Sequence, residues 1–137
     1  FNEFGHDDLT LENVQKKCLE TCESLGLSLE FCQTDDEIVL TNYLTKAFKE
    51  FDALIINPVG YSHASSLDFE IYTSNIERIT LQNKPVIEVH IVNIFQKGIN
   101  ITTPIKVSEG SVGFVSGFGI HSYDLAIRAV NKKLRKN

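Results

Sequence analysis

The sequence predicts a single α/β domain of three layers, in which helices cover both faces of a parallel sheet. Three observations predict it. Segments with helical periodicity alternate with strand-like segments along the chain. The strand-like segment 53–56 is a continuous apolar run, which is typical of a strand covered on both faces. The length of 137 residues and the hydrophobic fraction of 42% suit one domain with its own core, so we assign residues 1–137 to one domain.

The first part of the chain predicts a helix, a strand and a second helix. Thr10 is a predicted N-cap, and apolar side chains then recur at helical spacing up to Gly26, where this helix is expected to end. Residues 27–34 alternate apolar and polar side chains, which predicts a strand. Asp35 and Asp36 can cap the second helix. The apolar face of that helix consists of Leu40, Leu44, Ala47, Phe48 and Phe51.

The rest of the chain predicts three more strands and two more helices. The apolar strand at 53–56 stops at an Asn-Pro pair, and a loop followed by a helix occupies 60–82. A strand is predicted over 86–95, an irregular loop over 95–108, and a glycine-rich strand over 111–119. The last helix follows, with Tyr123, Ile127, Val130 and Leu134 on one face.

Composition excludes several classes of protein. The net charge of −5 argues against a surface for nucleic acid or an anionic membrane. No apolar run approaches the length of a membrane span and no signal peptide is visible, so we expect a cytoplasmic protein. The cysteines Cys18, Cys22 and Cys32 are odd in number, which does not suit a disulfide framework. We expect all three to be small buried hydrophobic residues in a reducing compartment.

Ligands of open α/β sheets bind beyond the carboxyl ends of the strands, and polar residues follow two predicted strands there. Glu88 and His90 are two positions apart, so both side chains point to one face of their strand. A carboxylate beside an imidazole fixes its tautomer and favours the imidazolium, which makes His90 a candidate general acid. The alternative is a structural pair at a sheet end. Asn57 is either a turn former or a ligand contact, and His63 on a polar loop is a second candidate contact.

Neither a metal nor a cofactor is expected. His63, Glu88 and His90 could form a metal site, but no dense ligand motif supports one. No glycine-rich phosphate loop precedes a helix.

The motifs INPVGYSH and KPVIEVHIVN, followed by GFVSGFGIHSY before the last helix, make the chain resemble the type II 3-dehydroquinate dehydratases from about Leu9 onward. The resemblance implies a flavodoxin-like fold and trimers that assemble into a dodecamer. It also implies the dehydration of 3-dehydroquinate to 3-dehydroshikimate in the shikimate or quinate pathway, and hence a role in aromatic amino acid biosynthesis. The reaction runs through an enolate and needs no metal or cofactor.

The resemblance also assigns roles to individual residues. It makes His90 the general acid that protonates the leaving hydroxyl, and Glu88 the carboxylate that orients it. The positions that it assigns to binding of the carboxylate substrate are the side chains of Asn57 and His63 and the backbone amides of Ile91 and Val92.

The sequence departs from the family pattern at the catalytic base. The family's first strand and its lid arginine have no match, and Phe4 or His6 stands where the family has its tyrosine base. The acidic residue that reaches a neighbouring subunit has only Asp68 and Glu70 as candidates. Three hypotheses follow. The chain is a divergent dehydratase with another base, or an impaired or inactive homologue that binds a small carboxylate or has a structural role in an oligomer. The third is a different lyase or isomerase that uses His90 on another hydroxy acid.

The missing first strand has a structural consequence. In the flavodoxin-like order it lies inside the sheet, between the predicted strands at 27–34 and 53–56. We therefore expect that an upstream segment exists, or that these two strands pair directly, or that another chain fills the gap.

Overall fold

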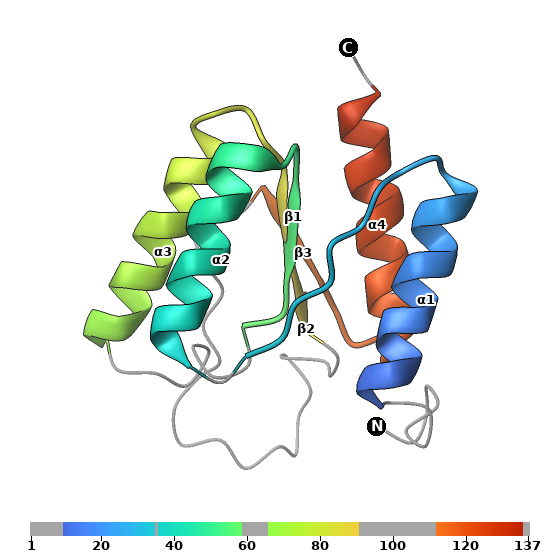
Figure 1. Cartoon of the computed structure of the whole chain (residues 1–137), viewed down its shortest axis with the longest axis horizontal. Helices are drawn as coiled ribbons and strands as arrows, with labels where there is room; N and C mark the ends of the chain where they lie inside the picture. Colours follow the sequence, from blue (N-terminus) through green and yellow to red (C-terminus); the bar gives the residue numbers. More distant parts are fainter. Residues whose placement is uncertain (1–9, 35, 59–65, 91–111, 136–137) are drawn as a thin grey trace.

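The structure, a computed structural model, describes residues 10–34, 36–58, 66–90 and 112–135. It contains α1 (Leu11–Ser24), α2 (Glu37–Glu50), β1 (Leu54–Ile56), α3 (Ser66–Thr80), β2 (Val86–His90), β3 (Gly113–Ser116) and α4 (His121–Leu134). Figure 1 shows three layers: the sheet stands edge-on in the middle, with α2 and α3 on one side and α1 and α4 on the other. The predicted α/β/α architecture is confirmed.

The described strands form one parallel sheet in the order β1-β2-β3. Leu54 pairs with Val86 and Ile56 with Glu88, while His90 at the end of β2 pairs with Ser116. Because all three strands run the same way, their carboxyl ends meet at one edge of the sheet. That edge is where α/β sheets place their ligands.

The predicted helix ends of the first half are confirmed. The Thr10 hydroxyl accepts a hydrogen bond from the Asn13 amide at 3.0 Å and caps α1. The Asp36 carboxylate caps α2 by accepting from the amides of Ile38 and Val39. Gly26 follows α1 with a φ of +72°, a conformation that a side chain would strain. Local sequence therefore sets these boundaries.

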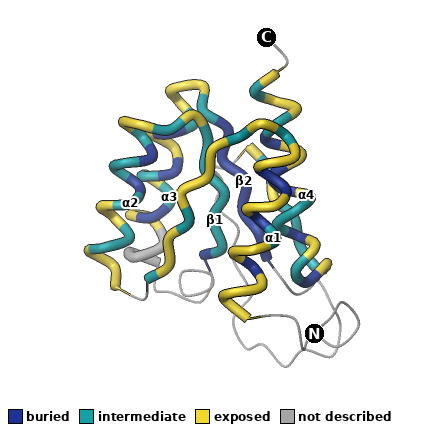
Figure 2. The backbone as a smooth tube through the Cα atoms, turned by 45° about the vertical axis from the view of Figure 1, so that its right-hand side comes forward, coloured by how far each residue is buried: buried dark blue, intermediate teal, exposed yellow. Residues whose placement is uncertain are grey.

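Two packed interiors hold the sheet between the helix pairs. On one face, Ile76 and Ile79 of α3 and Leu44 and Ala47 of α2 pack against Val86. On the other face, α4 covers β2 with a cluster formed by Ile87, Val89, Ala126 and Val130. The β2 strand is buried along its whole length (Figure 2). Successive side chains of β2 point to opposite faces of the sheet, and helices cover both faces, so every residue of the strand is buried.

The predicted strand at 27–34 is wrong. The segment runs extended from α1 to α2 across the front of the molecule in Figure 2, but it joins no described strand and is largely exposed. Leu27 and Phe31 nevertheless pack against the same cluster as Ile55 of β1. The alternation thus reflects half-burial of side chains, whereas a strand also needs a neighbour for its backbone hydrogen bonds. Direct pairing of 27–34 with 53–56 is therefore not found.

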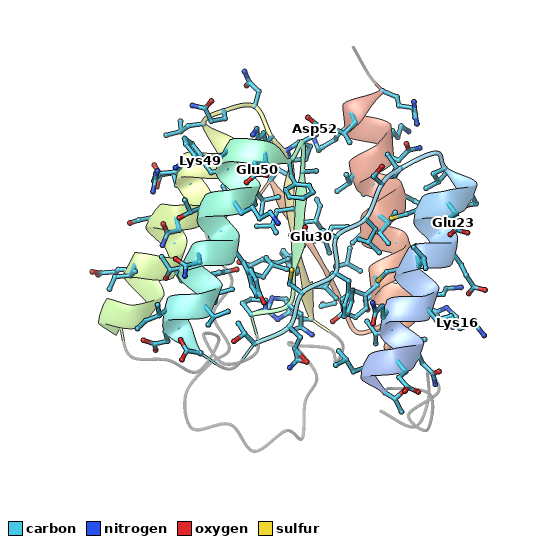
Figure 3. All side chains as sticks on the ribbon, in the orientation of Figure 1. Lys16, Glu23, Glu30, Lys49, Glu50 and Asp52 are labelled. Atoms are coloured by element: carbon cyan, nitrogen blue, oxygen red, sulfur yellow. The ribbon has the colours of Figure 1, made fainter. Side chains whose placement is uncertain are left out.

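One described ion pair links the exposed side of this segment to α2. Glu30 in the segment accepts a hydrogen bond from the Lys46 ammonium of α2 at 2.9 Å. Figure 3 shows Glu30 beside the sheet, while Lys16 and Glu23 point outward from α1. Both partners of the Glu30 pair are substantially exposed, so the pair contributes little free energy.

The other predictions can be compared only in part. The strand predicted over 86–95 is confirmed up to His90, and the strand predicted over 111–119 is observed as Gly113–Ser116. The loop predicted over 95–108 lies outside the described residues. Cys18 and Cys22 are buried as expected, but Cys32 is exposed because it lies on the unpaired segment.

Candidate active site

The candidate site lies at the carboxyl edge of the sheet, where β1 ends before Asn57 and β2 ends at His90. The backbone oxygen of His90 accepts a hydrogen bond from the Gly117 amide at 2.9 Å, just after β3. Gly117 has a φ of +88°, which only glycine adopts without strain. The chain can therefore turn sharply over the end of β2 before α4 begins.

Glu88 and His90 form a buried pair. The Nε2 atom of His90 lies 3.2 Å from Oε1 of Glu88, and the two side chains are 5% and 0% exposed. Their position on one face of β2, predicted from the spacing, is confirmed. A hydrogen bond from His90 to an ionised Glu88 would require a proton on Nε2, because a carboxylate without a proton only accepts, and would leave Nδ1 for a further partner.

Tyr72 of α3 is a third member of this cluster that the sequence did not single out. Its hydroxyl donates a hydrogen bond of 3.0 Å to Oε2 of Glu88, and its side chain is buried. Burial, followed by the charge and hydrogen bond of Glu88, raises the pKa of Tyr72 above its usual range. The hydroxyl therefore stays protonated and remains a donor. The available signal was the helical spacing of Tyr72, Ile76 and Ile79, because a buried tyrosine needs a polar partner.

The imidazole ring of His90 is also held from the side of β3. Phe114 packs edge-on against it, with ring centroids 6.4 Å apart and planes at 85°. Phe114 is the register partner of Glu88. Phe114 is itself 43% exposed, so it covers one side of the imidazole with apolar surface without sealing it from water.

Asn57 lies at the same edge but faces the other helix layer. Its side-chain nitrogen donates to the Tyr123 hydroxyl of α4 at 2.9 Å. Its Oδ1 atom is buried and has no hydrogen-bond partner within the part of the chain that the structure describes. Burial raises the pKa of Tyr123, although the hydrogen bond from Asn57 opposes the rise. Asn57 thus offers a buried acceptor at the sheet edge, which a turn former does not need.

The structure leaves several predicted residues untested. His63, Ile91 and Val92 lie outside the described residues, as do Phe4 and His6. Of the two candidate acidic residues, the side chain of Asp68 is also outside, whereas Glu70 is exposed. His121 begins α4 and is exposed.

The described residues contain neither a cluster of metal ligands nor a membrane-spanning helix. Within the described ranges, no group of three or more histidine, cysteine, aspartate or glutamate side chains could hold a metal ion. None of the helices in those ranges is long and apolar enough to cross a bilayer. The cluster that the structure does describe consists of the hydrogen-bonded Tyr72, Glu88 and His90 side chains.

Comparison with known proteins gives a consistent family. The family model for dehydroquinase class II matches residues 2–131. A 3-dehydroquinate dehydratase of Caulobacter sp. strain K31 is 36% identical over 126 residues, which cover 92% of this chain and 79% of that protein. One from Clostridium botulinum strain Langeland is 29% identical over 133 residues, which cover 96% of this chain and 82% of that protein.

Solved structures agree with the sequence comparison. A type II dehydroquinase from Propionibacterium acnes has a TM-score of 0.75 at 26% identity, covering 90% of this chain and 79% of that one. A 3-dehydroquinate dehydratase-like protein from Bifidobacterium longum has a TM-score of 0.72 at 28% identity, covering 90% of this chain and 88% of that one. The parallel sheet with helices on both faces therefore has the flavodoxin-like architecture predicted above.

Proposed function

The chain belongs to the class II dehydroquinase family, and on that premise we propose that it removes water from 3-dehydroquinate to give 3-dehydroshikimate. The observation that carries the proposal is the buried Glu88–His90 pair at the carboxyl edge of the sheet. Relatives named 3-dehydroquinate dehydratase support the same reaction.

In the proposed reaction, a base removes the proton next to the ketone and leaves an enolate. The enolate then forms the carbon–carbon double bond as the hydroxyl group leaves. The imidazolium of His90 donates its proton to that hydroxyl, so that water departs and the neutral imidazole remains. Glu88 stabilises the imidazolium before this step and holds the ring in place.

Substrate binding is proposed at the residues that follow the strands. The buried Oδ1 of Asn57 can accept a hydrogen bond from a substrate hydroxyl. His63 is proposed to contact substrate hydroxyls, and the backbone amides of Ile91 and Val92 to hold the substrate carboxylate. Amide donors suit an anion because they add no titratable group.

The base is the part of this mechanism that the described residues do not provide. The raised pKa values of Tyr72 and Tyr123 keep both phenols protonated, which makes them unsuitable as bases. Phe4, at one candidate position of the family's tyrosine, has no ionisable group. His6, at the other candidate position, is ionisable. If neither His6 nor another residue acts as the base, the second candidate function applies, in which the chain binds a small carboxylate without turnover.

An ultraviolet assay that follows the conjugated enone of 3-dehydroshikimate separates the two functions. We expect turnover by the unaltered protein and a loss of about two to four powers of ten in His90→Ala. His121→Ala is the matched control, because His121 is exposed and starts α4 away from Glu88. Absence of turnover, together with binding of 3-dehydroquinate in calorimetry, would support the binding function instead.

Self-association as trimers and a dodecamer is also proposed from the family resemblance. Light scattering of the purified protein tests it, and a monomeric mass would contradict it.

A further inference from the structure

The carboxylate of Glu88 is contacted from two directions. Its Oε1 atom faces Nε2 of His90, and its Oε2 atom accepts the hydroxyl of Tyr72. The two contacts come from different layers, since Tyr72 belongs to α3 and His90 to β2 itself. The orientation of this carboxylate is therefore shared between a helix and a strand that pack against each other.

We propose that Tyr72 is a positioning residue that acts through Glu88 to fix which nitrogen of His90 carries the proton. By holding Oε2, the Tyr72 hydroxyl sets the rotation of the carboxylate so that Oε1 points at Nε2. In the neutral ring His90 then keeps its proton on Nε2, so that Nδ1 is the nitrogen that takes up the second proton of the imidazolium and gives it to a ligand. An effect of Tyr72 on catalysis rests on the dehydratase function proposed above. Its effect on the tautomer of His90 does not depend on that function.

The need for such a residue follows from the freedom of the carboxylate. The last torsion of a glutamate side chain is broad, so packing of the stem alone does not fix the plane of the two oxygens. A fully buried carboxylate also requires hydrogen-bond donors, because burial without them is costly. The hydroxyl of Tyr72 meets both needs, and it sits on a rigid helix whose next turn is buried against the sheet at Ile76.

The register partners of Glu88 on the neighbouring strands are apolar. Ile56 of β1 and Phe114 of β3 are the register partners of Glu88 on either side, and neither side chain offers a hydrogen-bonding group. The Tyr72 hydroxyl of α3 therefore holds Oε2 at a place where these two neighbours in the sheet offer no side-chain donor. Partners that fix the orientation of a catalytic or ligating histidine typically change activity by about ten- to a hundredfold when removed.

The test compares nitrogen-15 spectra of the histidine rings in the unaltered protein and in Tyr72→Phe, with His90→Ala to assign the signals. We expect the unaltered protein to show His90 protonated at Nε2, and Tyr72→Phe to show a mixture of tautomers. Tyr43→Phe is the control, because it removes one hydroxyl from α2, and Tyr43 bonds neither Glu88 nor His90 in the described structure. An unchanged His90 tautomer in folded Tyr72→Phe would overturn the proposal.

A second variant covers the case in which Tyr72→Phe does not fold. Glu88→Gln keeps the volume of the side chain but can donate as well as accept, so the tautomer preference is expected to be lost. An unchanged tautomer there would also overturn the proposal, because Tyr72 is argued to act only through Glu88.

Kinetics separate this proposal from the proposed function. If the protein turns over 3-dehydroquinate, we expect Tyr72→Phe to lower kcat about tenfold with little change in KM. The double variant that combines Tyr72→Phe with Glu88→Gln should then have the same kcat as Glu88→Gln alone, because Tyr72 acts through Glu88. If no variant turns over but the tautomer still changes in Tyr72→Phe, the dehydratase function fails and the positioning role stands.

Discussion

The side-chain amide of Asn57, directly after β1, donates a 2.9 Å hydrogen bond to the phenol oxygen of Tyr123 in the first turn of α4. The bond fixes Asn57 on the α1/α4 side of the sheet, whereas Glu88 and His90 face α3. At the carboxyl edge of the sheet, the polar side chain after β1 therefore lies on one face and the polar side chains of β2 lie on the other. A ligand that bridges them must lie over the ends of the strands.

Removal of the Tyr123 hydroxyl tests whether its hydrogen bond with Asn57 holds the Asn57 side chain in position. Tyr123→Phe leaves the buried amide group of Asn57 without its acceptor, which is expected to lower the free energy of unfolding by about 1 to 3 kcal/mol. Asn57 then loses its fixed orientation, so KM for 3-dehydroquinate should rise several-fold while kcat changes little. Urea denaturation and steady-state kinetics measure the two effects. An unchanged KM would show that Asn57 does not contact the substrate.

The contact between α1 and α4 predicts a pH-dependent stability. The hydroxyl of Thr21 donates to Oδ1 of Asp124 at 2.8 Å, and Arg128 pairs with Oδ2 at 3.2 Å. Burial alone would raise the pKa of Asp124, but these hydrogen bonds and the charge of Arg128 outweigh it and lower the pKa below its ordinary value. A depressed carboxyl pKa stabilises the folded state above the unfolded pKa, and this stabilisation is lost as the pH falls through the folded pKa.

Asp124→Asn should therefore lower the free energy of unfolding by about 0.5 to 1 kcal/mol at pH 7, a modest value because the group is partly exposed. The difference from the unaltered protein should shrink as the pH falls from the ordinary aspartate pKa of 3.8 through the lowered pKa of Asp124. Urea titrations at pH 7 and at an acidic pH measure this difference in unfolding free energy, and Asp52→Asn at an exposed position is the control. A difference that persists in acid would mean that packing, rather than charge, explains the effect.

The interior between α3 and the sheet predicts a large cavity effect. Ile76 is fully buried among Tyr72, Ile79 and Val86, so Ile76→Ala is expected to cost about 2 to 5 kcal/mol of unfolding free energy. Ile38→Ala, at a side chain 74% exposed on α2, should cost less than about 0.5 kcal/mol. Thermal or urea unfolding compares the pair. Equal losses would contradict the described burial.

The three cysteines are expected to differ in reactivity. Burial raises the pKa of Cys18 to about 11 and also raises that of Cys22, so few thiolates form at either position. Cys32 is exposed, although burial of its sulfur and the neighbouring Glu30 raise its pKa as well. A thiol-specific chromogenic reagent at pH 8 should label Cys32 alone, and more slowly than a free cysteine. Rapid labelling of all three before denaturation would contradict this expectation.

Sequence reasoning was most successful where the signal was local. Thr10, Asp36 and Gly26 set helix ends through their own side chains or backbone, and each lies where the sequence predicts. The pairing of Glu88 with His90 was also local, because residues two apart on a strand share a face. The contact between Tyr72 and Glu88 could not be predicted from the sequence, because the sequence does not fix the position of α3 along β2.

The sequence by itself determined the alternation of helices and strands, the parallel sheet and the acid–imidazole pair at the end of β2, because these depend on periodicity and on neighbours along the chain. Only the tertiary structure decided that residues 27–34 pair with no described strand and that Tyr72 completes the cluster around Glu88. It also decided that Asn57 turns toward Tyr123. The physical reason is that hydrogen bonds between distant segments depend on how whole layers pack, which no local pattern encodes.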